Sequence, residues 1–256
     1  ATGAGSGDLI SFGYDRDTTS WTALTDLNTD GISDAIDPQS FDVEFESVTG
    51  DALVVYGKDT GDSIYYRTMS ADEDDWNDES EFDGSGGDTT DPNWLRLYRD
   101  PASDDIMFVW EQSIAGGAFL QTSLWDGSSW GAVTDHGETV LIDGLKVSQD
   151  FDFAWEGNRG EGVLAWLECD AGAGSCGGGG DDDSNVEYNT WTSGSWDTQD
   201  TIATVQTGNN GKATGGQVVM ATQYETTHNK IGLAYIGGQD KRLHSTIWDD
   251  NGWSIV

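Results

Sequence analysis

The stretch WLRLYRDPASDDIMFVWE, residues 94–111, decides the fold because its pattern recurs along the chain. It reads as a strand, a polar turn and a second, almost wholly apolar strand. The same pattern stands at FDVEFESVTGDALVVYG (41–57), FDFAWEGNRGEGVLAWLE (151–168) and VVMATQYETTHNKIGLAYIG (218–237). A unit of short strands that recurs every 50 to 70 residues cannot bury its own faces, so we expect the units to stack on one another.

A third strand follows the pair in each repeat, as SIYYRTMS, FLQTSLW, VEYNTW and RLHSTIW. It runs into a tight turn (WDGSSW, WTSGSW, WDDNGW in the later repeats) and then into a short polar fourth strand. Four antiparallel strands, of which the second is apolar and the last is exposed to solvent, are typical of a propeller blade. Helical periodicity is absent. The sequence therefore predicts an all-β protein, a β-propeller of four-stranded antiparallel blades.

The N-terminal residues break the repeat in an informative way. LISFGYDRDTTSW (9–21) matches only the second half of a unit, with Trp21 at the position of the turn tryptophans. We therefore expect four complete blades and one half-blade, which favours a five-bladed ring over a four-bladed ring with an extra hairpin. The predicted single domain, 1–256, divides into a half-blade with its following loop (1–40) and blades at 41–92, 93–146, 147–216 and 217–256.

Charge limits the range of partners. The net charge is −36, from 47 acidic and 11 basic residues. Nucleic acid and anionic membranes would be repelled, and no run of eighteen apolar residues could span a bilayer. An acidic, lysine-poor surface suits high salt or a calcium-rich exterior. The small residues ATGAGSG at the start are of the kind that signal-peptide removal leaves, so we expect an extracellular or cell-surface location.

The two cysteines, Cys169 and Cys176, lie in the glycine-rich segment CDAGAGSCGGGGDDDS. The flexible spacer allows a local disulfide, with two free thiols as the alternative. A bond that closes so short a loop contributes only about 2 kcal/mol, so it would order a surface loop and not hold the fold. If formed, it indicates an oxidising compartment.

The segment DLNTDGISDAID, residues 26–37, has the spacing of a calcium loop. Ca²⁺ takes six to eight hard oxygens on a flexible loop, and a glycine at position 6 permits the sharp turn. The segment resembles the calcium loops of thrombospondin type 3 repeats and of dockerin-type and integrin-propeller proteins, without the helices of an EF-hand. The expected ligands are Asp26, Asn28, Asp30, the carbonyl of Ile32, Asp34 and Asp37. The alternative is a plain Asp/Gly turn.

At the level of the whole chain, residues 41–256, and 9–22 in part, resemble secreted prokaryotic β-propeller repeat proteins. FDVEFE, GDALVVYG, YRT and the tryptophan turns carry the resemblance. It implies an extracellular location and a binding or structural role, not a reaction.

No catalytic constellation stands out. The histidines (His136, His228, His244) occupy unrelated repeat positions, and neither HExxH nor GxSxG occurs. The Asp-box turn of sialidases, which are also propellers, is not met by SLWDGSSW (123–130). We therefore expect a protein that is not an enzyme; a sialidase-like glycosidase ranks last.

Three turns carry tryptophans five residues apart. Such pairs could be sugar-stacking platforms, as in fucose-type propeller lectins, or could pack across each hairpin and between blades. We expect packing to be the main role of these tryptophans.

The favoured function of the chain is a calcium-binding extracellular module for adhesion or filament assembly with a protein partner or a second copy. The principal alternative is a carbohydrate-binding lectin that uses the tryptophan pairs. The pairs are Trp125 and Trp130, Trp191 and Trp196, and Trp248 and Trp253.

Overall fold

A computed structural model gives the fold of this chain. It describes residues 8–15, 17–24, 26–28, 39–58, 61–73, 75–82, 92–114, 117–139, 149–157, 159–169, 184–205, 217–223, 230–236, 242–249 and 252–255. Every regular element in these ranges is a strand, and every strand pairing is antiparallel, so the all-β prediction is confirmed. Across the same ranges, no helix is long and apolar enough to cross a membrane.

The strands group into four units in chain order, preceded by a hairpin. The N-terminal hairpin is β1 (Phe12–Asp15) and β2 (Ser20–Ala23). The first unit is β3 (Phe41–Phe45), β4 (Ala52–Lys58), β5 (Gly61–Met69) and β6 (Ser80–Phe82). The second unit is β7 (Pro92–Arg99), β8 (Ile106–Ile114), β9 (Gly117–Trp125) and β10 (Thr134–Thr139).

The third unit is β11 (Phe151–Trp155), β12 (Gly162–Cys169), β13 (Ser184–Thr192) and β15 (Asp200–Val205), with the short β14 (Ser195–Trp196) in its outer turn. The fourth unit is β16 (Val218–Thr222), β17 (Ile231–Ile236), β18 (Leu243–Trp248) and β19 (Trp253–Ile255). The second and third units count as one nine-stranded sheet because a single residue pair, Thr139 and Glu168, joins β10 to β12.

Equivalent residues occupy equivalent places in the four units. An aromatic residue of the second strand lies opposite an apolar residue near the start of the first strand: Tyr56 faces Phe41, Trp110 faces Leu95, Trp166 faces Phe151, and Tyr235 faces Val218. All four aromatic residues are buried. The recurring sequence pattern therefore corresponds to the same register in each inner strand pair.

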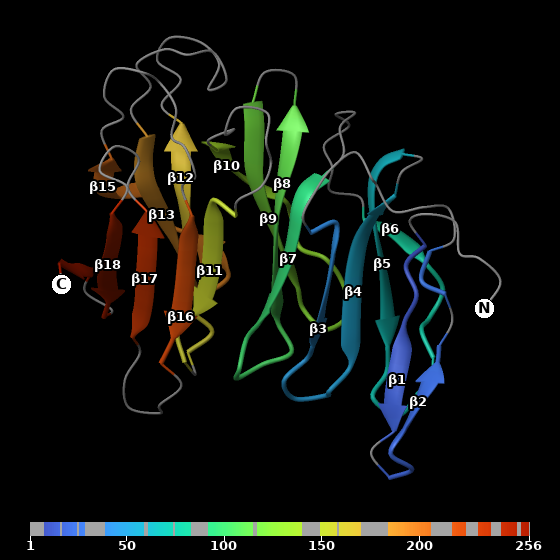
Figure 1. The fold of residues 1–256 in the computed structure, drawn as a ribbon. Helices are drawn as coiled ribbons and strands as arrows, with labels where there is room; N and C mark the ends of the chain where they lie inside the picture. The colour runs from blue at the N-terminus through green and yellow to red at the C-terminus, as the bar shows by residue number, and fades with distance from the viewer. Residues whose placement is uncertain are drawn as a thin grey trace.

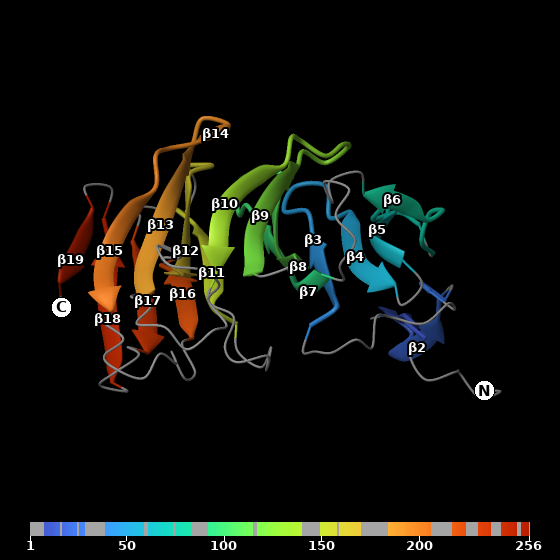
Figure 2. The same cartoon turned by 90° about the horizontal axis from the view of Figure 1, so that it is seen from above.

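The units stack face to face in a row, as Figures 1 and 2 show. One apolar cluster lies between the first and second units, one between the second and third, and one between the third and fourth. Each cluster contains aliphatic side chains from the second strand of one unit and side chains from the first two strands of the next. The second strands of the first three units, β4, β8 and β12, are consequently covered on both faces, which explains why their sequences are continuously apolar. In the fourth unit, β17 is buried on alternate residues only, so one of its faces is covered.

In the described ranges no strand pairing joins the fourth unit to the hairpin or to the first unit. The hairpin of β1 and β2 and the sheet of β16 to β19 lie at opposite ends of the row (Figure 1). Four-stranded antiparallel units are thus present, whereas the number of blades in a closed ring stays a prediction.

Candidate functional site

The three tryptophan pairs lie on the outer turns of the second, third and fourth units. In each pair the two residues are direct cross-strand partners. Their ring centroids are 5.2, 5.2 and 5.5 Å apart, and the rings are tilted or edge to face. All three pairs pack against an inter-unit apolar cluster. The packing role that the sequence favours is therefore present in each pair.

In two of the pairs, the first tryptophan also donates a hydrogen bond to the preceding unit. Trp125 Nε1 donates a hydrogen bond of 2.9 Å to Glu46 Oε1 of the first unit, and Trp248 Nε1 donates to Glu156 Oε1 of the third unit. Glu46 and Glu156 occupy the same position, just after the first strand of their units. Both carboxylates are buried. These two tryptophans are thus structural.

Trp191, the equivalent residue in the third unit, lacks this arrangement because the preceding unit has an aspartate at the equivalent position. The shorter Asp100 carboxylate accepts the Ala102 N–H (2.9 Å) and the Ser103 hydroxyl (2.9 Å) of its own turn. Trp191 remains partly exposed and lines an open groove between the second and third units.

This inter-unit groove has a volume of about 490 Å³ and a mixed aromatic and polar lining. Trp191 and Trp196 come from the outer turn of the third unit, and Trp130 from that of the second. The polar lining includes Asp126, Thr134 and Ser195. Gly194, between the two tryptophans of the third unit, has a φ of +85° and open space around its Cβ position. A side chain there would strain the turn and project from it.

The walls of the groove are held by internal hydrogen bonds. Asp126 accepts hydrogen bonds from the Ser128 hydroxyl and from the N–H groups of Ser129 and Ser128, and these bonds lower the pKa of its carboxyl. Behind Trp196 lies the buried His136, whose ring centroid is 4.8 Å from the indole. Burial lowers the pKa of His136, so this ring is neutral near pH 7. Asp126 therefore presents a negative charge at the rim, while the wall behind Trp196 carries none.

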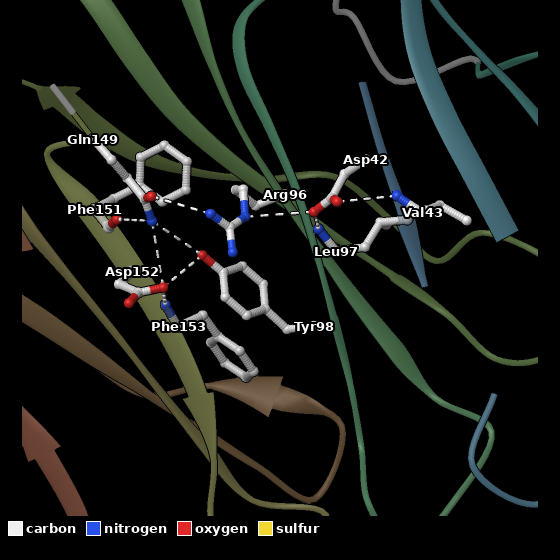
Figure 3. A network of polar contacts seen from close by, with 9 residues as sticks. All are labelled: Asp42, Val43, Arg96, Leu97, Tyr98, Gln149, Phe151, Asp152 and Phe153. Carbon is white, nitrogen blue, oxygen red and sulfur yellow. Dashed lines mark hydrogen bonds and ion pairs between the residues drawn. The ribbon is translucent and has the colours of Figure 1, made fainter. Parts of the chain in front are cut away.

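A polar network crosses the inner strands of three units (Figure 3). Arg96 Nε lies 3.4 Å from Asp42 Oδ2 of the first unit, and Arg96 Nη1 donates a 3.2 Å hydrogen bond to Gln149 Oε1 beside β11. The Tyr98 hydroxyl donates to Asp152 Oδ1 at 2.7 Å. Arg96 of the second unit thus lies between Asp42 of the first unit and Asp152 of the third unit.

The two aspartates of the network also bind the backbone of the next unit. Asp42 Oδ2 accepts the Leu97 N–H at 2.9 Å, and Asp152 Oδ2 accepts the Met220 N–H at 2.7 Å. Burial raises the pKa of both carboxyls. Burial also raises the pKa of Tyr98 well above its ordinary value, so the phenol stays protonated and is a poor nucleophile. The network is arranged to join units.

A pair of carboxyl groups, Glu111 of β8 and Asp150 before β11, is buried between the second and third units. Burial raises the pKa of Asp150 well above its ordinary value, and the neighbouring charge of Glu111 raises it further. Neither residue lines the inter-unit groove. A glycosidase needs two carboxyl groups that face one cleft, which this buried pair does not provide.

The predicted calcium loop lies mostly outside the described residues. Asp26 and Asn28 are described, whereas Asp30, Ile32, Asp34 and Asp37 are not. Asn28 is buried and forms a bridge with Leu9. In the described ranges no group of three or more His, Cys, Asp or Glu side chains could hold a metal ion. Calcium binding therefore stays a prediction.

The predicted disulfide lies outside the described side chains. Cys169 ends β12, but its side chain is not described, and Cys176 falls outside the described ranges.

Sequence reasoning missed the Glu46 and Glu156 contacts and the role of Gln149. The recurrence of Glu46, Asp100 and Glu156 after the first strand of three successive units is a visible signal that could have indicated a shared function.

Comparison with known proteins adds little. No family model matches the chain, and no curated protein matches it. Among solved structures, it is similar to an α-L-arabinofuranosidase from Fusarium graminearum, with 12% identity over 91% of this chain and 71% of that chain and a TM-score of 0.45. It is also similar to a fucose-specific lectin from Aleuria aurantia, with 14% identity over 92% of this chain and 82% of that chain and a TM-score of 0.34. At these scores neither likeness decides the fold or the function.

Proposed function

We propose that this chain is a non-catalytic carbohydrate-binding module and that the groove between the second and third units is its binding site. The observation that carries the proposal is the position of Trp191. Its counterparts Trp125 and Trp248 donate to a buried carboxylate of the preceding unit, whereas Trp191 lines an open groove together with Trp196.

The chemistry of the groove suits a neutral sugar. A pyranose ring offers apolar C–H faces and a belt of hydroxyl groups, and a site for it combines aromatic surfaces with a few polar groups. The indoles of Trp191 and Trp196 supply the aromatic surfaces. The polar groups are those of Asp126, Thr134 and Ser195. The net charge of −36 would repel an anionic glycan, so we expect an uncharged one.

Three further features belong to this proposal. The stacking of the units supports a β-propeller, with five blades favoured. Calcium binding by the segment Asp26 to Asp37 would order the connection between the hairpin and the first unit. The location that fits a glycan-binding, acidic module is extracellular or on the cell surface, where it would act in adhesion.

The test is a glycan array probed with the fluorescently labelled chain, followed by calorimetry with the best neutral glycan. We expect Trp191→Ala to weaken binding by about tenfold or more, since loss of an aromatic stacking surface in a binding site commonly costs over 1 kcal/mol. The matched control is Trp21→Ala, because Trp21 is 69% exposed on the N-terminal hairpin and does not line the groove. A chain that binds no glycan, or that loses affinity equally in both variants, would contradict the proposal.

A further inference from the structure

Three apolar side chains on β3 of the first unit are uncovered. Phe41, Val43 and Phe45 are 44%, 45% and 48% exposed. The residues equivalent to Phe41 and Val43 in the later units are buried in the inter-unit clusters, because the preceding unit lies over them: Leu95, Leu97, Phe151, Phe153, Val218 and Met220. The first unit thus has the same apolar face as the later units, but within the described ranges no unit lies over this part of it.

The N-terminal segment covers only the other half of this face. Leu9 and Leu27 pack on Val54 and Tyr56, which lie on β4. The hairpin corresponds to the third and fourth strands of a unit, because Tyr14 lies opposite Trp21 as Trp125 lies opposite Trp130. The uncovered part is therefore the place that the first and second strands of a preceding unit would occupy.

The strand edge next to this place is also open. In each complete unit the third strand pairs with the fourth strand on one edge and with the second strand on the other. Among the described strands, β1 pairs with β2 alone. Its second edge presents backbone N–H and C=O groups to an incoming strand, and such an edge is a template for strand addition.

The other interfaces show what covers such a face. Phe151 and Phe153, two of the three aromatic residues of β11, pack in one cluster with Met107 and Val109 of β8. These two residues alternate along one strand of an antiparallel pair, β7 and β8. The required cover is thus a two-stranded unit whose second strand carries branched or flexible apolar side chains at alternate positions.

We propose that the first unit, together with the free edge of β1, is a docking site for a β-hairpin supplied by another protein. Its second strand adds to β1 and sets alternate apolar side chains on Phe41, Val43 and Phe45; its first strand lies along the inner side. Basic residues on the hairpin favour docking, because the chain carries a net charge of −36. This surface is separate from the inter-unit groove, and the inference does not depend on carbohydrate binding.

The probe is a backbone-cyclised peptide of residues 92–112, the hairpin that packs on aromatic residues in the third unit, with lysine in place of Asp104 and Asp105 so that basic residues outnumber acidic ones. Cyclisation removes much of the ordering cost of an isolated hairpin. Titrated into the intact chain in a calorimeter, it should bind once per chain. A peptide with aspartate at the positions of Met107 and Val109 should not bind, because charged groups would be buried against the aromatic residues.

The chain variant Val43→Lys places an ammonium group in the contact and should weaken peptide binding about tenfold or more. The control is Leu243→Lys, which changes a 74% exposed apolar residue in the fourth unit and should leave affinity unchanged. Both positions are exposed, so both variants should fold like the parent. No heat of binding at about 200 µM peptide, well above a micromolar Kd, or equal affinities of the two variants, would overturn the proposal.

Discussion

Replacing Trp125 with Phe should destabilise the chain far more than the same change at Trp191. The Trp125 indole donates a 2.9 Å hydrogen bond to the buried Glu46 carboxylate. A hydrogen bond to a charged group contributes about 1.5–3 kcal/mol, and its loss leaves a buried acceptor without that donor. The smaller phenyl ring removes a further ~1 kcal/mol of apolar burial, since Trp125 is itself buried. The expected loss in the free energy of unfolding is about 2.5–4 kcal/mol.

Urea unfolding followed by circular dichroism measures this loss. Trp191→Phe is the matched variant: its residue has the same repeat position but lines the groove, so we expect a loss of about 1 kcal/mol or less. Trp248→Phe should resemble Trp125→Phe, because Trp248 donates to Glu156 in the same way. Equal losses at Trp125 and Trp191 would refute the reasoning, because the two indoles would then have the same structural role.

Three other outcomes are expected. Burial raises the pKa of Asp150, so the native state favours the protonated carboxyl, and stability is lost as pH rises through that raised pKa. The Asp150→Asn variant cannot ionise at this position. It should therefore melt at a higher temperature than the parent at pH 7.5, and the difference in melting temperature should disappear near pH 4. Tyr98→Phe removes the donor to the buried Asp152 carboxyl and should cost about 1–3 kcal/mol in urea unfolding. Removal of Ca²⁺ by a chelator should lower the melting temperature of the parent but not of Asp30→Ala, and an unchanged parent curve would remove the calcium site.

The strand order of each unit could be predicted from the sequence because its signals are local. Alternation and turn residues within 94–111 are enough to specify a hairpin, and a tryptophan on each side of a tight turn indicates cross-strand partners. The hairpin at residues 12–23 follows from the same signals, and so does the free edge of β1.

The contacts between units could not be predicted in this way. Arg96 and Gln149 are 53 residues apart, and their pairing depends on how one inner strand lies beside the next. The contrast between Trp191 and its two counterparts depends on one methylene group, because Asp100 replaces the glutamate found at positions 46 and 156. A repeat pattern predicts equivalent positions, but it does not predict which of them departs from the shared contact.

The most direct measurement of the central claim is a crystal structure of the chain with the neutral glycan that binds it best. Carbohydrate binding by the inter-unit groove predicts a sugar ring stacked on Trp191 or Trp196, with hydroxyl groups within hydrogen-bonding distance of Asp126 or Ser195. Electron density for the sugar at any other place, with the groove between the second and third units empty, would contradict the account.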